Sequence, residues 1–296
     1  MLKLKDLITE APGDGTALGT NKVIGLSKID PKVAKAAWDG GTNDGDPKDD
    51  VVAGKKVPIA VGALKPAQSE LIKAKAFGMV IDFVLRDKWQ NADLGNIVSS
   101  DNYIMDGHHR WAAIILINPK AKANVTQIDL PGQALVTTLN LITVGKLNIT
   151  KGNDGSGNIA EFTGANFEAI IDEALTNGIP GKFPKTPEEV AEAIGKIPGA
   201  NGDAQAGKAI VMKNADKMPT SIMPGAPKRV EMPVIDEDKI AMVVKQLKQG
   251  ALDIQEPFSQ GVTPVSGDED VQEDGYKPKG NALKERFQKI ANIIKG

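Results

Sequence analysis

Apolar positions follow two different spacings in the middle of the chain. Short runs rich in Val and Ile have the spacing of strands, whereas longer runs repeat apolar residues three and four positions apart, as one face of a helix requires. The expected strands are 57–63, 102–105 and 125–130. The expected helices are 66–86, 111–117 and 133–146. Strands that alternate with helices predict an α+β (α/β) domain with a small mixed sheet and flanking helices.

After residue 150 the pattern becomes mostly helical. Residues 166–176 are amphipathic, and a second helix is expected after Thr186, because Pro187 suits the first helical position and Glu189 completes a capping box. Residues 219–233 are rich in Pro and Met and are typical of a linker. The further helices expected in this C-terminal extension are 236–252 and 281–295.

These changes of pattern divide the chain into four parts. The expected parts are a loop-rich N-terminal extension at 1–50, a strand-and-helix domain at 51–150, a small helical appendage with its linker at 151–235, and C-terminal helices with an acidic linker at 236–296. The last helix, 281–295, is basic and amphipathic. We expect it to dock onto the rest of this chain, onto a protein partner or a second copy of the chain, or onto an acidic surface.

The composition excludes several classes of protein. The chain of 296 residues has a formal net charge of −2 and contains no cysteine. Without an excess of basic residues DNA is a less favoured partner, and without cysteine neither a disulfide framework nor a cysteine-based zinc site can form. No apolar run is long enough to span a membrane and no signal-peptide run opens the chain, so we expect a cytoplasmic protein.

The strongest candidate for a functional site is the sequence Asp-Gly-His-His-Arg at 106–110, which contains both histidines of the chain. It lies between an expected strand and an expected helix, where backbone N–H groups lack helical partners and the helix dipole favours an anion. Gly107 permits a tight turn, and Arg110 adds a fork of donors that suits phosphate. These residues indicate a phosphate-binding turn. The alternative is that Asp106 is only a turn or capping residue, and that the two histidines are merely exposed at the surface or satisfied by backbone carbonyl groups.

Two blocks of the chain resemble the ParB/sulfiredoxin superfamily. Residues 57–70 are similar to the family's opening strand and the Pro-initiated helix that follows it. The sequence Gly-His-His-Arg-Trp-Ala-Ala at 107–113 is similar to the sulfiredoxin pattern Gly-Cys-His-Arg-Tyr-Ala-Ala and to the Gly-x-x-Arg box of ParB-type nucleotide-binding domains. The resemblance covers 51–150 and implies a ParB/sulfiredoxin-like nucleotide-binding domain there. Because His108 stands where sulfiredoxin has its reactive cysteine, sulfinic-acid repair is excluded.

The resemblance also implies roles for individual residues. His109 and Arg110 match the family's phosphate-contacting pair, and Ser69 matches a helix serine that contacts the nucleotide. Glu70 is the nearest match to an acidic residue of the first helix that acts as a base in the free-serine kinase branch. The expected nucleotide-binding residues are Lys65, Ser69, Gly107, His109 and Arg110. The expected catalytic residues are Glu70, Asp106 and His108, and Asp106 is also the expected Mg²⁺ ligand beside phosphate oxygens.

Three functions are compatible with these features. The first is an enzyme that binds ATP or another nucleotide, such as CTP or ADP, with Mg²⁺, and that hydrolyses a nucleoside triphosphate or transfers its phosphoryl group to a small acceptor. The second is a nucleotide-gated ParB-like DNA-binding protein or nuclease, which ranks lower because the helices at 166–176 and 187–197 are acidic. The third is a structural or interaction protein with a vestigial site, whose terminal helix docks a partner. The 106–110 signature also resembles that of phage-encoded ParB-like proteins, and a phage-encoded protein is expected in the host cytoplasm or the virion.

Overall fold

The computed structural model describes residues 23, 25–32, 34–35, 54–152, 157–181 and 184–232. These residues all belong to one compact unit of the chain. The helices predicted at 236–252 and 281–295, and with them the predicted docking surface, lie outside the described residues, as does most of the extension predicted at 1–50.

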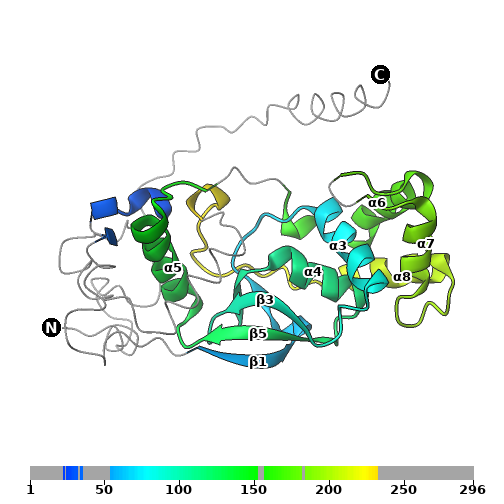
Figure 1. Ribbon diagram of the computed structural model, residues 1–296, viewed down its shortest axis with the longest axis horizontal. Coiled ribbons are helices and arrows are strands. Elements are labelled where there is room, and N and C mark those ends of the chain that lie inside the picture. Colours follow the sequence, from blue (N-terminus) through cyan, green and yellow to red (C-terminus); the bar gives the residue numbers. More distant parts are fainter. Residues whose placement is uncertain are drawn as a thin grey trace, which may run out of the picture. The chain divides into compact units, whose positions relative to one another are not determined.

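A mixed sheet of five strands lies at the centre of the described part (Figure 1). The strands are β1 (Gly54–Ala60), β2 (Lys65–Pro66), β3 (Ala92–Val98), β4 (Tyr103–Asp106) and β5 (Lys122–Ile128). Their order across the sheet is β1-β5-β3-β4-β2. The pairs β1–β5 and β3–β4 are antiparallel, whereas β3–β5 and β2–β4 are parallel. A small mixed sheet flanked by helices confirms the predicted α+β class.

The sequence pattern does not predict β3, although this strand is in the middle of the sheet. Its residues, Ala-Asp-Leu-Gly-Asn-Ile-Val, contain few β-branched side chains, so the period of two that marks a strand is weak. Backbone hydrogen bonds stabilise this strand despite its weak local preference, because β3 lies between β5 and β4 and pairs with both. Strand β3 also carries Asn96, which lies beside the candidate site.

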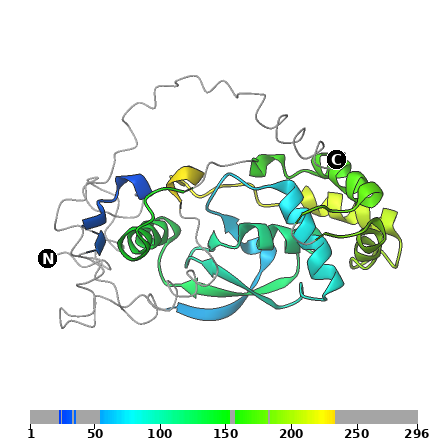
Figure 2. The same cartoon turned by 45° about the horizontal axis from the view of Figure 1, so that its top comes forward.

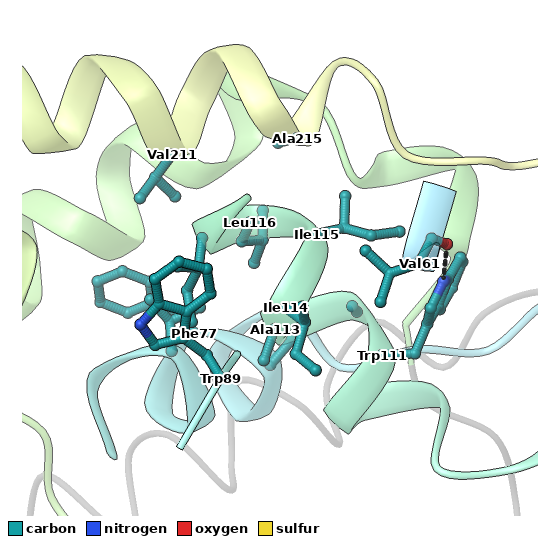
Figure 3. Close-up of a cluster of buried hydrophobic side chains, with 14 of the residues drawn as sticks. Val61, Phe77, Trp89, Trp111, Ala113, Ile114, Ile115, Leu116, Val211 and Ala215 are labelled. Atoms are coloured by element: carbon teal, nitrogen blue, oxygen red, sulfur yellow. Dashed lines mark hydrogen bonds between the residues drawn. The ribbon is translucent and has the colours of Figure 1, made fainter. Parts of the chain in front are cut away.

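Helix α4 is the most deeply buried of the helices that cover the sheet. The helices near the sheet are α3 (Lys73–Leu85), α4 (His108–Ile117) and α5 (Gly132–Leu147), and the 3₁₀ turns of the described part are η1 (Leu26–Lys28), η2 (Val61–Ala63), η3 (Ile159–Glu161) and η4 (Arg229–Glu231). Every residue from Trp111 to Ile117 is buried, as expected of a helix that is apolar all round. Trp111 Nε1–H donates to Val61 O at 2.9 Å, which ties α4 to η2 (Figure 3).

Three helices after residue 150 share the core of α3 and α4. They are α6 (Gly164–Asn177), α7 (Pro187–Gly195) and α8 (Ala204–Ala215). The capping box predicted between Thr186 and Glu189 is present at the start of α7. Figure 3 shows Val211 and Ala215 of α8 packed over α4. The side chain of Asn214 donates to Leu116 O and Ile117 O, so it caps the C-terminus of α4. The predicted domain and its predicted appendage therefore share one hydrophobic core.

The segment after α8, predicted as a linker, is bonded along the surface of this unit (Figure 2). We call residues 219–232 the strap. Its hydrogen bonds join Met223 N–H to Pro66 O (3.0 Å), Gln133 Nε2–H to Pro224 O (2.7 Å), Gly152 N–H to Val230 O (2.7 Å) and Ser27 Oγ–H to the Glu231 carboxylate (2.7 Å). Met223 and Met232 are buried, so both ends of the strap are held by apolar contacts as well as by hydrogen bonds.

None of the helices in the described part of the chain is both long enough and apolar enough to cross a membrane.

Candidate functional site

The candidate site begins at the sharp turn between β4 and α4. Gly107 occupies this turn with φ = 93°, in the left-handed region that glycine adopts without a Cβ clash. Helix α4 begins at the next residue, and its N-cap residue, Gly107, provides no side-chain cap. The N–H groups of His108, His109 and Arg110 therefore lack partners within the helix, and the positive end of the helix dipole is added to them. The predicted strand–turn–helix junction is present.

The two histidines hold a loop in place. His108 Nε2 accepts the backbone N–H of Ala67 at 3.1 Å, and His109 Nε2 accepts the backbone N–H of Ile72 at 3.1 Å. Ala67 and Ile72 are the two ends of the segment between β2 and α3. Adjacent imidazoles thus fix both ends of one six-residue loop, which we call the 67–72 loop.

Both imidazoles are neutral at pH 7. Burial lowers the pKa of His108 to about 3, and the nearby charges of His109, Arg229 and Arg110 act in the same direction. Burial also lowers the pKa of His109 to about 4, aided by Lys75, Arg229 and Arg110. A neutral imidazole that accepts at Nε2 carries its proton on Nδ1. The structure thus shows His108, predicted as catalytic, and His109, predicted as a phosphate contact, as acceptors of loop N–H groups.

The 67–72 loop carries two of the predicted site residues, Ser69 and Glu70. A single helix over 66–86 was predicted there, and this prediction is wrong: Pro66 ends strand β2, and α3 begins only at Lys73. The reason is tertiary, because the two histidine acceptors and the bond from Ile159 N–H to Ser69 O satisfy backbone groups that a helix would otherwise satisfy. Ser69 and Glu70 therefore lie on a loop and not on a helix.

Glu70 is in an environment that favours its protonated form. Burial raises the pKa of its carboxyl, and this effect exceeds two opposing ones, the charge of Arg229 and a hydrogen bond from the Arg229 backbone. A carboxylate with a raised pKa is a better proton acceptor near neutral pH than an ordinary one. Its position beside the α4 N-terminus is compatible with the predicted role as a base.

Asp106 and Arg110 form an ion pair on either side of the turn. Arg110 Nη2 lies 2.5 Å from Asp106 Oδ2, four residues earlier, and both side chains are partly buried. Arg110 is thus at the start of α4, as its predicted role requires, with Asp106 as its counter-ion. A negatively charged ligand here would compete with Asp106 for the guanidinium.

Asn96 is a site residue that the sequence pattern does not predict. It lies on β3 and is fully buried, and among the described residues neither its Oδ1 nor its Nδ2 has a hydrogen-bond partner. Its Oδ1 lies 2.0 Å from the position that a Cβ would take on Gly107, so the amide lies against the residue that directly precedes α4. A buried polar group left without a partner costs about 1–3 kcal/mol. In the sequence, Asn96 is marked only as a polar residue directly before the apolar pair Ile97 and Val98.

Arg229 is the second residue missed from the sequence. It lies on the strap, beyond the region 51–150 where the site was predicted, and it is half-buried. Its charge acts on Glu70, Asp106 and both histidines. A sequence signal for it is weak, because it is one of many basic residues in a stretch that resembles a linker.

Lys65 makes a contact different from the predicted one. Its ammonium lies 4.2 Å from the centre of the Tyr103 ring, on the neighbouring strand β4, with which β2 pairs at this position. A cation over an aromatic face is stabilised by the ring quadrupole. The structure thus places Lys65 against Tyr103, and its predicted assistance to phosphate binding stays a prediction.

A metal site made by the protein alone is not present in the described part of the chain, where no group of three His, Cys, Asp or Glu residues could hold a metal ion. A Mg²⁺ ion held by Asp106 together with phosphate oxygens of a ligand stays a prediction.

We compared the chain with family models, curated proteins and solved structures. None of them matches it. The resemblance to the ParB/sulfiredoxin superfamily thus stays a prediction, and the case for a function rests on the geometry of the α4 N-terminus.

Proposed function

We propose that this protein binds a nucleotide through its phosphates at the N-terminus of α4, and that it catalyses phosphoryl transfer to water or to a small acceptor. The observation that carries the proposal is Asn96, a fully buried amide without a partner among the described residues, which lies against the residue that directly precedes an uncapped helix start. An uncapped helix start attracts anions. Asn96 Oδ1 lies against Gly107, and a flip of this amide exchanges Oδ1 for Nδ2, a donor that needs an acceptor such as a phosphate oxygen.

Each residue around the turn has a defined part in this proposal. The N–H groups of α4 and the guanidinium of Arg110 bind phosphate oxygens, and Gly107, which has no Cβ, permits the tight turn and leaves space for Asn96 beside it. Glu70, with its raised pKa, accepts the proton of the attacking hydroxyl or water. Mg²⁺ would supply further charge neutralisation through Asp106 and the phosphates. His108 and His109 position the loop that carries Glu70.

Binding is tested by isothermal titration of ATP, ADP, CTP and GTP, with and without Mg²⁺, into the whole chain and two variants. Arg110→Gln should weaken nucleotide binding by about ten- to hundredfold, the value of a lost charge-assisted hydrogen bond. Arg86→Gln is the matched control, because Arg86 also pairs with an aspartate four residues earlier, Asp82, but at the end of α3. Equal affinity of Arg110→Gln and wild type, or no binding by the wild type, contradicts the proposal.

Catalysis is tested with Glu70→Gln in an assay of phosphate release. Turnover should fall by about 100-fold or more, the usual contribution of a general base. Nucleotide affinity should stay the same or rise, because the substitution removes a negative charge beside the phosphate site. Undiminished turnover in this variant shows that Glu70 is not the base.

A further inference from the structure

The strap brings a basic residue to the candidate site from outside the region where the site was predicted. Met223 N–H donates to Pro66 O, directly before the 67–72 loop, and Met223 packs against Ala67. At the other end Val230 O accepts from Gly152 N–H, and the Glu231 carboxylate accepts from Ser27. Arg229 directly precedes Val230 and Glu231, so the backbone is held immediately after it, and Met223 holds the strap six residues before it.

Arg229 is opposite two acidic residues of the site. The Glu70 carboxylate faces both the backbone N–H and the side-chain charge of Arg229, and the charge of Asp106 also acts on the guanidinium. One guanidinium N–H donates to Met232 O at 3.3 Å. The site therefore has two cations on two different elements, Arg110 on α4 and Arg229 on the strap.

Without a ligand, Asp106 offsets the charge of Arg110, and Glu70, in its ionised form, offsets the charge of Arg229. A single phosphate group carries up to two negative charges, which the helix N-terminus and Arg110 can balance. A second, linked phosphate adds negative charge that needs another cation, and Arg229 is the cation placed on the Glu70 side of the turn.

We propose that Arg229 contacts the ligand and binds a second phosphate, so that the site selects molecules with at least two linked phosphates over those with one. This inference rests on the proposed function, because it assigns the first phosphate to the N-terminus of α4 and Arg110. A guanidinium suits this task, because its fork of donors bonds two phosphate oxygens at once.

The test measures binding of inorganic phosphate, inorganic pyrophosphate, AMP and ADP to the full chain by isothermal titration. The wild type should prefer pyrophosphate over phosphate and ADP over AMP. Arg229→Gln should weaken pyrophosphate and ADP binding by about ten- to hundredfold and change phosphate and AMP binding by less than about threefold. Lys228→Gln, at the exposed neighbouring position, is the control and should retain wild-type affinities.

Arg229→Lys extends the test to a variant that keeps the charge. It should retain more of the pyrophosphate preference than Arg229→Gln, and less than wild type because the fork of donors is lost. Circular dichroism and the melting temperature show whether Arg229→Gln folds. If it does not, the ratio of pyrophosphate to phosphate affinity is measured in Arg229→Lys instead and compared with that of the wild type.

The outcomes separate this inference from the proposed function. Arg229→Gln with an unchanged ratio of pyrophosphate to phosphate affinity, whether both affinities are kept or both fall by the same factor, overturns the role of Arg229. Phosphate binding by the wild type then still supports the α4 site. Absence of binding by the wild type, or unchanged phosphate binding by Arg110→Gln, overturns the proposed function and this inference with it.

Discussion

The two histidines should make the protein sensitive to acid. Each is neutral in the folded state and accepts a loop N–H group at Nε2. A proton on Nε2 would turn this acceptor into a donor that faces another donor. The pKa values of about 3 for His108 and about 4 for His109 are below the ordinary 6.5, so the unfolded chain binds protons that the folded chain does not.

The sign and size of the effect follow from these values. Between pH 4 and pH 6.5 the unfolded chain binds more protons, so stability falls as pH falls. At pH 5 the ordinary histidine pKa of 6.5 lies 1.5 units above the pH of the solution. This difference lowers the free energy of unfolding by about 2 kcal/mol for each histidine. Together they should remove about 4 kcal/mol between pH 7 and pH 5, a large part of the 5–15 kcal/mol that is usual for a folded domain.

Urea denaturation at pH 7 and pH 5, followed by tryptophan fluorescence, measures this loss, because Trp111 is fully buried in the folded state. The matched variant is His108→Gln with His109→Gln. The amide oxygen of glutamine accepts a hydrogen bond at the same reach but does not titrate in this range. Because the chain has two histidines, the double variant has none, and all other titrating groups are common to both proteins.

The difference between the two proteins isolates the histidines. The wild type should lose about 4 kcal/mol more than the double variant on going from pH 7 to pH 5, and each single variant should account for about half. Equal losses in wild type and double variant would refute the reasoning, because they would show that the imidazoles are not held neutral by the fold.

Two further predictions concern the ends of α4. Gly107→Ala should destabilise the protein more than Gly202→Ala. Both glycines have positive φ, and alanine at either position is strained by about 1–2 kcal/mol. Only at Gly107 would the new Cβ also meet Asn96, whereas the space beside Gly202 is open. Equal melting temperatures of the two variants would contradict the placement of Asn96. Asn214→Ala should cost about 1–3 kcal/mol in urea denaturation, because two buried carbonyl groups lose their donor, and the exposed Gln205→Ala on the same helix should be neutral.

The fold was predictable where local signals agree with tertiary contacts. The helix at 166–176, the helix opened by Thr186 and Pro187, and the strand–turn–helix at residue 107 are all present. In each case a cap, a proline or a glycine marks the boundary within the segment itself. The α+β class follows from these elements and is confirmed.

The failures occur where distant residues decide the local structure. Residues 67–72 have helical spacing, yet His108 and His109 accept the N–H groups at both ends of that segment. Strand β3 has weak strand preference and exists through its two neighbours. Asn96 and Arg229 reach the site only through β3 and the strap, so no pattern within 51–150 could have joined them to Arg110.

The course of the strap has a consequence for synthesis of the protein. The turn at Gly107 emerges from the ribosome early, but Asn214 caps α4 and the strap bonds to Pro66 only after residues beyond 214 have been made. Domains fold as their residues become available. Until translation has passed residue 232, the N-terminal half therefore lacks the cap on the C-terminus of α4 and the strap contacts beside the 67–72 loop. A truncated chain that ends near residue 150 should contain the whole signature sequence and still lack a finished site.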